Sequence, residues 1–164
     1  MKELNMKKTG LIATTLCYIE HDGKYLMLHR TKKKDDFNQD KWIGVGGKFE
    51  ENESPEECLC REVMEETGLV LSSYQLRGIV TFVSDQWYNE TMYLFTATTN
   101  FAEVITCEEG ELVWVDKSEI FHLPMWEGDS IFLKLLQDEK RFFTLKLVYQ
   151  GSKLKESKVH VYGA

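Results

Sequence analysis

Residues 47–69 read GKFEENESPEECLCREVMEETGL, and this stretch predicts the central helix of the fold. Ser54 followed by Pro55 is typical of a helix start, because serine accepts a backbone N–H and proline suits the first helical position. Glu57 completes a capping box with Ser54, and Gly68 is typical of a helix end. The stretch therefore predicts a helix of about four turns between Ser54 and Gly68.

Glutamates gather on one side of this predicted helix. At about 100° per residue, an apolar face is expected opposite an acidic face. The apolar face comprises Leu59, Cys60, Val63 and Met64, and the acidic face comprises Glu62, Glu65 and Glu66. Like charges at helical spacing cost roughly 0.2–0.5 kcal/mol per pair, and a divalent cation would reverse this cost. Two interpretations stay open: a solvated acidic surface, or a set of metal ligands.

The chemistry of these side chains favours one kind of metal. Carboxylate oxygens suit hard cations such as Mg²⁺ or Mn²⁺, and the chain has no His or Cys cluster that would suggest zinc. Magnesium retains water ligands and bridges to phosphate oxygens. The acidic helix thus indicates phosphoryl chemistry with Mg²⁺ as cofactor and Mn²⁺ as an alternative.

The spacing of residues 47–69 resembles the Nudix box at every defining position: Gly, five residues, Glu, seven residues, then Arg-Glu-apolar-any-Glu-Glu-any-Gly-apolar. A match over contiguous positions of this length is far more specific than a short glycine motif. The chain is therefore identified as a member of the Nudix hydrolase family. The resemblance implies an α/β fold, a Nudix-type α/β/α sandwich around a mixed β-sheet. It also implies an enzyme, a pyrophosphohydrolase that cleaves the phosphate chain of a nucleoside di- or triphosphate.

The resemblance further implies roles for single residues of the box. The metal ligands would be Glu62, Glu65, Glu66 and the carbonyl oxygen of Gly46. Arg61 would be structural and would pair with Glu53, so that the loop is held against the helix. The glycines of residues 44–47 are themselves typical of tight backbone geometry or of close approach by a ligand.

A further acid from outside the box is also implied. Glu109 stands where the oxidised-purine nucleotide hydrolases have a metal-binding or catalytic acid, with Glu108 and Glu111 as neighbouring alternatives and a solvated loop carboxylate as the plain one. A glutamate is expected to accept the proton of the attacking water. The candidates for this base are Glu62, Glu66 and Glu109.

Beyond the box, residues 40–49 and 125–132 resemble bacterial 8-oxo-dGTP diphosphatases, which are MutT-like, and the animal oxidised-purine nucleoside triphosphatases. By this resemblance Trp126 would stack on the purine and Asp129 would read the base edge. Trp126 packed against the last helix, and Asp129 as a helix cap, are the structural alternatives. Further substrate contacts are implied for Phe37, Arg30 and Lys48.

The same segments depart from the animal pattern at two positions. Ile43 stands where that branch has an asparagine that bonds the base, and Gly128 replaces one of two adjacent aspartates. Stacking alone confers little selectivity, because every base has an aromatic face. Preference for an oxidised guanine is therefore not predicted by these residues.

Three functions are compatible with the sequence. The first is hydrolysis of an oxidised purine nucleoside triphosphate, such as 8-oxo-dGTP, to the monophosphate and pyrophosphate, which would sanitise the nucleotide pool in support of DNA repair. The second is hydrolysis of another nucleoside diphosphate derivative, such as ADP-ribose, a nucleotide sugar or a dinucleoside polyphosphate. The third is a non-catalytic domain that senses a nucleotide. Intact Glu62, Glu65 and Glu66 disfavour the third, since their mutual repulsion would have no purpose without a metal.

Composition limits the class of protein. The chain has 164 residues, which suits one domain over residues 1–164, and a formal net charge of −7, which disfavours binding to duplex nucleic acid or to an anionic membrane. No apolar stretch is long enough for a transmembrane helix, and the four cysteines lack metal-ligand spacing. A cytoplasmic protein with a small-molecule nucleotide partner is expected, as a monomer or a homodimer.

The remaining elements are predicted from periodicity and turn residues. A hairpin is expected over residues 11–30, with its turn at residues 21–24, followed by a loop over residues 31–41. A second helix is expected over residues 129–137. Five further strands are expected over residues 75–84, 91–99, 111–115, 142–149 and 158–162.

Overall fold

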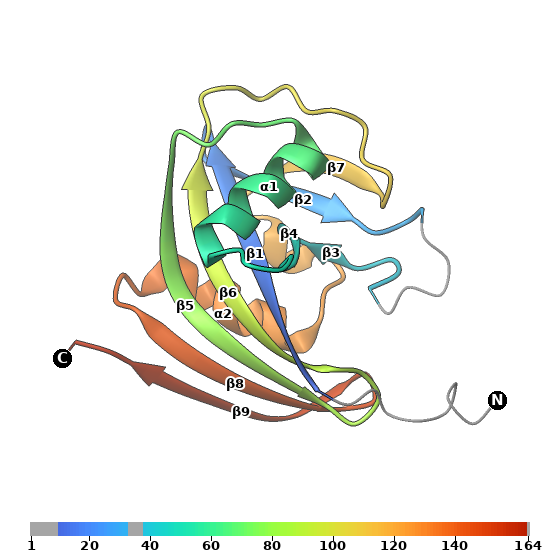
Figure 1. The fold of residues 1–164 in the computed structure, drawn as a ribbon, viewed down its shortest axis with the longest axis vertical. Helices are drawn as coiled ribbons and strands as arrows, with labels where there is room; N and C mark the ends of the chain where they lie inside the picture. The colour runs from blue at the N-terminus through green and yellow to red at the C-terminus, as the bar shows by residue number, and fades with distance from the viewer. Residues whose placement is uncertain (1–9, 33–37, 164) are drawn as a thin grey trace.

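The computed structural model describes residues 10–32 and 38–163 and shows a mixed β-sheet with one α-helix on each face (Figure 1). The helices are α1 (Pro55–Thr67) and α2 (Glu127–Asp138), and a short 3-10 turn, η2 (Ile120–His122), precedes α2. In the view of Figure 1, α1 lies in front of the sheet and α2 behind it. The predicted α/β/α arrangement is confirmed.

Nine strands form the sheet within the described residues. Seven of them follow the spatial order β3-β2-β1-β6-β5-β8-β9, while β4 pairs with β1 and β7 pairs with β2. The pairs β1·β6 and β5·β8 are parallel and the other pairs are antiparallel, so the sheet is mixed as predicted. The strands are β1 (Leu11–His21), β2 (Lys24–His29), β3 (Trp42–Ile43), β4 (Val45–Lys48), β5 (Ser73–Ser84), β6 (Asn89–Thr98), β7 (Glu111–Asp116), β8 (Phe143–Gln150) and β9 (Lys153–Val161).

The predicted hairpin is formed by β1 and β2, with Asp22 and Gly23 in the turn at positive φ. Two short strands, β3 and β4, were not predicted. Three of residues 44–47 are glycines, which are depleted in strands, yet β4 begins among them at Val45. Strand β9 begins at Lys153, five residues before the predicted start at residue 158. Its largely exposed side chains leave no alternation of apolar and polar residues to mark where it begins.

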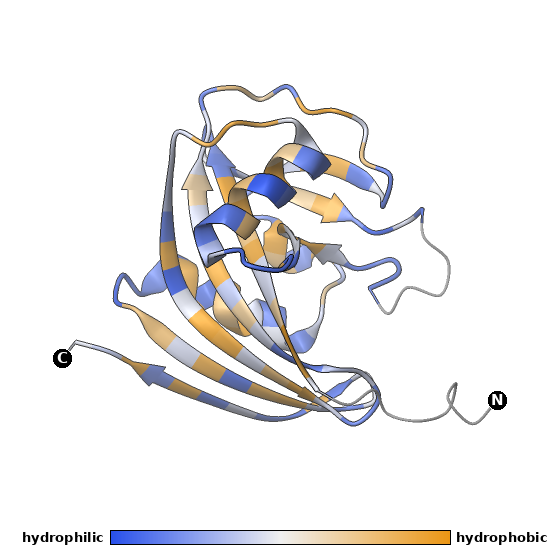
Figure 2. Cartoon of the chain, viewed as in Figure 1, coloured by the Kyte–Doolittle hydropathy of each residue, from blue (hydrophilic) through white to orange (hydrophobic). Residues whose placement is uncertain are grey.

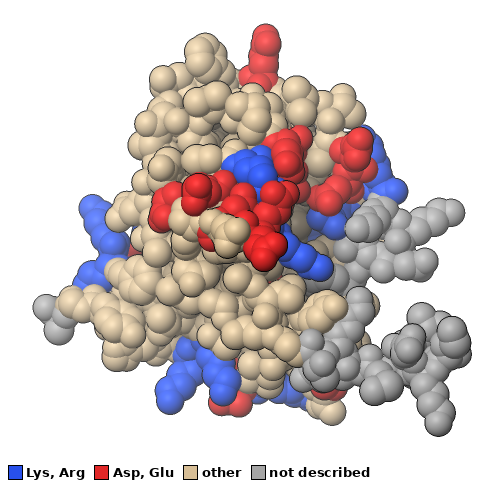
Figure 3. Space-filling model, in the orientation of Figure 1, with Lys and Arg blue, Asp and Glu red and all other residues tan. Residues whose placement is uncertain are grey.

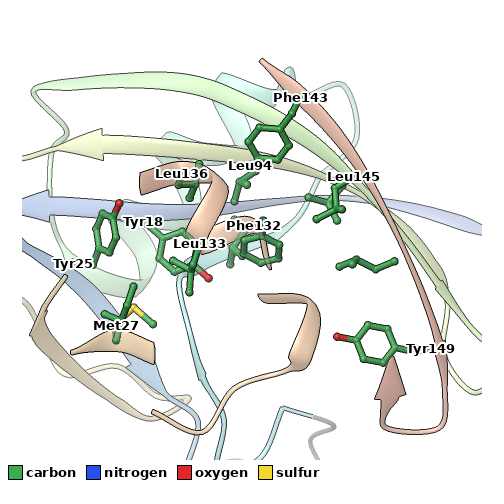
Figure 4. Close-up of a cluster of buried hydrophobic side chains, with 14 residues drawn as sticks. Tyr18, Tyr25, Met27, Leu94, Phe132, Leu133, Leu136, Phe143, Leu145 and Tyr149 are labelled. Atoms are coloured by element: carbon green, nitrogen blue, oxygen red, sulfur yellow. The ribbon is translucent and has the colours of Figure 1, made fainter. Parts of the chain in front are cut away.

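Strand β1 supplies side chains to two separate cores, one on each face of the sheet. Leu16 and Tyr18 belong to the core beneath α2, whereas Cys17 and Ile19 belong to the core beneath α1. This division follows from the alternation of side chains along a strand. The hydropathy colours of the strands alternate accordingly (Figure 2), and Figure 4 shows Phe132 and Leu133 of α2 lying among Tyr18, Leu94 and Leu145.

Helix α1 begins and ends as predicted. The hydroxyl of Ser54 accepts a hydrogen bond from the backbone N–H of Glu57, the Glu57 carboxylate accepts one from the N–H of Ser54, and Gly68 ends the helix at φ 76°. The predicted faces are partly wrong. Cys60 and Met64 are exposed, because the buried surface of the helix centres on Leu59.

The centre of that surface changes where the carboxylates lie. At about 100° per residue, Glu62 and Glu66 fall within about 60° of Leu59, so they flank the buried face. Both are partly buried, whereas Glu65 is exposed. Figure 2 shows polar residues along the outward surface of α1. The acidic and apolar faces are therefore adjacent, and two glutamates point toward the sheet side of the helix.

Candidate functional site

The glycines of β4 bring this strand unusually close to β1 and α1. A Cβ atom on Gly46 would lie 1.9 Å from the backbone oxygen of Thr15, and one on Gly47 would lie 2.5 Å from the carboxyl carbon of Glu62. Gly46 therefore requires glycine, whereas a Cβ on Gly47 would displace the Glu62 carboxylate; the sequence indicated such close approach for this segment. The close approach places the Glu62 carboxylate directly against the backbone of β4.

Arg61 joins the loop before α1 to the acidic side of the helix. It donates to Glu53 through Nε (2.6 Å) and Nη2 (2.9 Å), which is the pair expected from the sequence. It also donates to the Lys48 carbonyl (3.0 Å), and Nη1 reaches Glu62 at 2.9 Å and Glu65 at 3.3 Å. The Arg61 guanidinium lowers the pKa of Glu53 to about 2. One cation thus fixes the positions of three carboxylates, and Figure 3 shows basic and acidic side chains gathered over α1.

Glu66 and Glu109 come together from elements far apart in the chain. The backbone N–H of Gly46 donates to Oε2 of Glu66 at 3.2 Å. Burial raises the pKa of Glu66 to about 9, and the charge of the adjacent Glu109, with which it hydrogen-bonds, adds to this effect. Nearby like charges that raise a carboxyl pKa in this way are typical of functional sites.

Glu109 belongs to the loop that precedes β7. Its carboxylate accepts a hydrogen bond of 2.8 Å from Nη1 of Arg30. The next residue, Gly110, lies so close to β2 that a Cβ atom there would be 1.9 Å from the His29 backbone oxygen. This contact holds the loop over the sheet and places Glu109, rather than the exposed Glu108 or Glu111, beside α1.

The donor set of this region fits a hard divalent cation. Its side-chain donors are carboxyl groups, and two of them, Glu66 and Glu109, lie so close together that the charge of Glu109 disfavours ionisation of Glu66. Within residues 10–32 and 38–163, no three His, Cys, Asp or Glu side chains are already arranged around a common point. The reason is local, because Glu62 and Glu65 turn toward Arg61.

A single pocket of about 610 Å³ connects the glutamates with an aromatic region. One end is lined by the backbone of Gly46 and Gly47 and by charged side chains, which are Arg30, Lys48, Glu62, Glu66 and Glu109. The other end is largely apolar and is lined by residues that include Leu16, Ile43, Phe82, Trp87, Met92, Trp126 and Phe132. A ligand with an anionic and an aromatic part would match these two ends.

Trp126 stands at the aromatic end in a fixed orientation. Its indole Nε1 donates to Oδ1 of Asn38 at 2.7 Å, and its ring meets Tyr149 edge-on with centroids 5.5 Å apart. The Lys41 ammonium lies 5.2 Å from the ring centroid. Trp126 packs against the core beneath α2 and also lines the pocket, while its stacking on a purine stays a prediction.

Asp129 also lines the aromatic end. Burial raises its pKa to about 8, and the charge of Glu90 contributes to the shift. The alternative of a helix cap is wrong, because Trp126 is the N-cap residue and Asp129 lies inside the first turn of α2. Phe37, the remaining predicted substrate contact, lies outside the described residues.

Asn38 and Glu90 are among the pocket residues that were not found from the sequence. Asn38 lies in a polar loop and Glu90 near a strand start, and neither belongs to a recognisable motif. The only available signal for Glu90 was a charge on the strand face that continues with apolar Met92 and Leu94.

The profile of the Nudix domain matches residues 10–136 of the chain. The chain belongs to the Nudix family. The Nudix hydrolase YvcI of Bacillus subtilis is 33% identical over 133 residues, which cover 78% of this chain and 80% of YvcI. The oxidized purine nucleoside triphosphate hydrolase of Danio rerio is 30% identical over 132 residues, which cover 78% of this chain and 81% of the fish protein. The expectation of a Nudix pyrophosphohydrolase is confirmed.

A solved Nudix structure agrees with the architecture. The crystal structure of the MutT protein from Bacillus halodurans superposes with a TM-score of 0.80 at 27% identity, covering 90% of this chain and 97% of that one. No helix within the described residues has the length and apolar character needed to cross a membrane.

Proposed function

We propose that this Nudix enzyme hydrolyses a purine nucleoside triphosphate, such as 8-oxo-dGTP, to the nucleoside monophosphate and pyrophosphate, with Mg²⁺ as cofactor. The observation that carries the proposal is the continuous pocket, which has the acidic box residues at one end and an oriented tryptophan at the other. The name of the fish relative, a hydrolase of oxidized purine nucleoside triphosphates, supports the same substrate class.

The residues that would hold Mg²⁺ are Glu62, Glu65, Glu66, Glu109 and the carbonyl oxygen of Gly46. When bound, the ion would neutralise the phosphate chain and acidify a water molecule. The raised pKa of Glu66 suits it to keep a proton at neutral pH until a cation arrives. The carboxylates of Glu62, Glu66 and Glu109 are the candidates to accept the proton from the attacking water.

The cations of the pocket are suited to the phosphate chain. Arg30 and Lys48 both line the pocket, and Arg30 is held in place by its ion pair with Glu109. At the other end, Trp126 offers a face for the purine, and stacking of this kind contributes roughly 1–3 kcal/mol. Asp129 lies beside it and is suited to bond polar atoms of the base. The cytoplasmic location and the choice between monomer and homodimer stay predictions.

A single substitution tests the acidic end. With Mg²⁺ present, Glu66→Gln is expected to lower kcat for pyrophosphate release by at least about 100-fold, since loss of a catalytic carboxylate typically removes this much. Glu56→Gln is the matched control, because Glu56 is an exposed glutamate in the first turn of the same helix. Equal turnover of Glu66→Gln and the control would refute the proposed site.

The substrate is tested by comparing kcat/KM for 8-oxo-dGTP, dGTP and ADP-ribose in the wild-type enzyme. A higher value for 8-oxo-dGTP than for dGTP is the result expected of an enzyme that sanitises the nucleotide pool. A clear preference for ADP-ribose would assign the enzyme instead to nucleoside diphosphate derivatives.

A further inference from the structure

An acidic side chain outside the box lines the aromatic end of the pocket. Glu90 is the second residue of β6, and the side chains of Met92 and Leu94 follow it on the same face of the strand. Met92 and Leu94 belong to the apolar core beneath α2. In the sheet Glu90 lies between Ile12 of β1 and Phe82 of β5, and both of these also line the pocket. A carboxylate therefore continues a largely apolar strand face, with the Thr14 hydroxyl and the charge of Lys48 as its nearby polar groups.

The hydrogen bonds of Glu90 are only partly satisfied. Oγ1 of Thr14 donates to Oε2 at 2.6 Å, and Oε1 receives no hydrogen bond from the described residues. Burial raises the pKa of this carboxyl group, which shows that its surroundings solvate the charge poorly. A carboxylate with one unused oxygen at a pocket wall is suited to accept a hydrogen bond from a ligand.

Asp129, in the first turn of α2, lines the same end of the pocket. Its side chain receives no hydrogen bond from the described residues, and it lies near enough to Glu90 for that charge to raise its pKa. The residue before it cannot add a polar group, because a Cβ atom on Gly128 would lie 2.5 Å from Leu147 Cδ1 and 2.8 Å from the Tyr149 hydroxyl. The acidic groups here thus come from one strand and one helix.

We propose that Glu90 is a specificity-determining residue that accepts a hydrogen bond from the edge of a guanine-type base, with Asp129 as the second acidic group beside it. A 2-amino-6-oxopurine presents two neighbouring N–H donors, at N1 and at the 2-amino group, and these match carboxyl acceptors. Adenine presents an acceptor at N1 and would face the carboxylate with like polarity. This inference rests on the proposed function, in which the purine stacks at Trp126.

Glu90→Gln tests the proposal with little disturbance, because a glutamine carbonyl oxygen can still accept the Thr14 hydrogen bond. Its amide N–H₂ would oppose the guanine donors and pair with the adenine acceptor. The ratio of kcat/KM for dGTP to that for dATP is therefore expected to fall by at least about tenfold, since a site that leaves polar groups unpaired discriminates strongly. Glu156→Gln, at an exposed glutamate on β9, is the matched control and should leave the ratio unchanged.

Two outcomes would overturn the role of Glu90. One is a Glu90→Gln enzyme that loses activity equally toward both nucleotides, which would mean that Glu90 only supports the strand. The other is a wild-type enzyme without preference for guanine. Calorimetric binding of dGMP and dAMP without metal separates this inference from the proposed function. If no triphosphate is hydrolysed, the proposed function fails, while the ratio of the two dissociation constants in wild type and variant still tests Glu90.

Discussion

The pKa values of carboxyl groups are shifted in opposite directions in this protein. The pKa of Glu53 is lowered to about 2 by its bond to Arg61, whereas that of Glu66 is raised to about 9 by burial and by Glu109. Burial also raises the pKa of Asp129 to about 8. The box thus contains one glutamate that holds the structure and one that is poised to change its charge.

Asp129 gives a prediction about stability. Its pKa is raised in the folded state, so the folded protein binds this proton more tightly than the unfolded chain does. Its stabilising effect is complete below the ordinary pKa of 3.8 and is lost as the pH rises through about 8. The free energy of unfolding of the wild type should therefore fall between about pH 5 and about pH 8. In Asp129→Asn this fall is expected to be smaller by at least about 1 kcal/mol.

Urea denaturation of the nucleotide-free protein at both pH values measures this difference. Asp138→Asn is the matched control, since Asp138 is exposed at the end of the same helix. The same dependence on pH in Asp129→Asn and in the wild type would show that Asp129 is ionised at neutral pH.

The sequence predicted the residues whose role depends on local spacing. The pair of Arg61 with Glu53, and the gathering of Glu62 and Glu66, follow from positions on one helix and its preceding loop. Glu90 could not be predicted, because its importance arises only when β6 is placed beside β1 and opposite α2. A strand of mixed polarity gives no indication of which cavity it will line.

The element that positions the box is the close pair of β4 and α1. The sequence predicted α1 to within a residue, because capping residues mark both ends. It did not predict β4, whose glycines are selected for close approach and not for strand propensity. The predicted apolar face of α1 was also misplaced. Packing against the sheet, and not hydrophobicity alone, decides that Cys58 is buried and Met64 exposed.

Two neighbouring glycines of β4 should respond differently to alanine. At Gly47 the added Cβ meets the flexible Glu62 carboxylate, so the fold is expected to survive while Glu62 is displaced. We expect kcat to fall by at least about tenfold with little change in Tm, because misplacement of a catalytic group by about 1 Å is sufficient for such a loss. At Gly46 the Cβ meets the backbone of Thr15, and the pairing of β4 with β1 must open.

Gly46→Ala should therefore lower the free energy of unfolding by more than about 1 kcal/mol, whereas Gly47→Ala should not. Thermal unfolding and steady-state kinetics of both variants test the contrast. Full activity in Gly47→Ala would show that Glu62 does not need its observed position.

The free energy of global unfolding depends on what binds at the site. The two cores share one sheet, and β1 contributes to both, so loss of either face should unfold the protein cooperatively. The site joins both faces as well, since Glu62 and Glu66 come from α1, while Trp126 and Asp129 lie at the start of α2. A ligand at the site therefore stabilises the entire fold.

Metal binding should accordingly appear as a rise in Tm. Without a cation, Glu66 must take up a proton on folding, because burial and the charge of Glu109 disfavour its carboxylate, and a bound ion would stabilise the charged form instead. At a concentration about 100 times Kd, a ligand stabilises by roughly 2.7 kcal/mol, which for a chain of this size corresponds to a Tm rise of about 8 °C. NaCl at equal ionic strength controls for screening. Glu66→Gln should be more stable than the wild type without Mg²⁺ and should show a smaller rise with it, so an equal rise in both proteins would place the ion elsewhere.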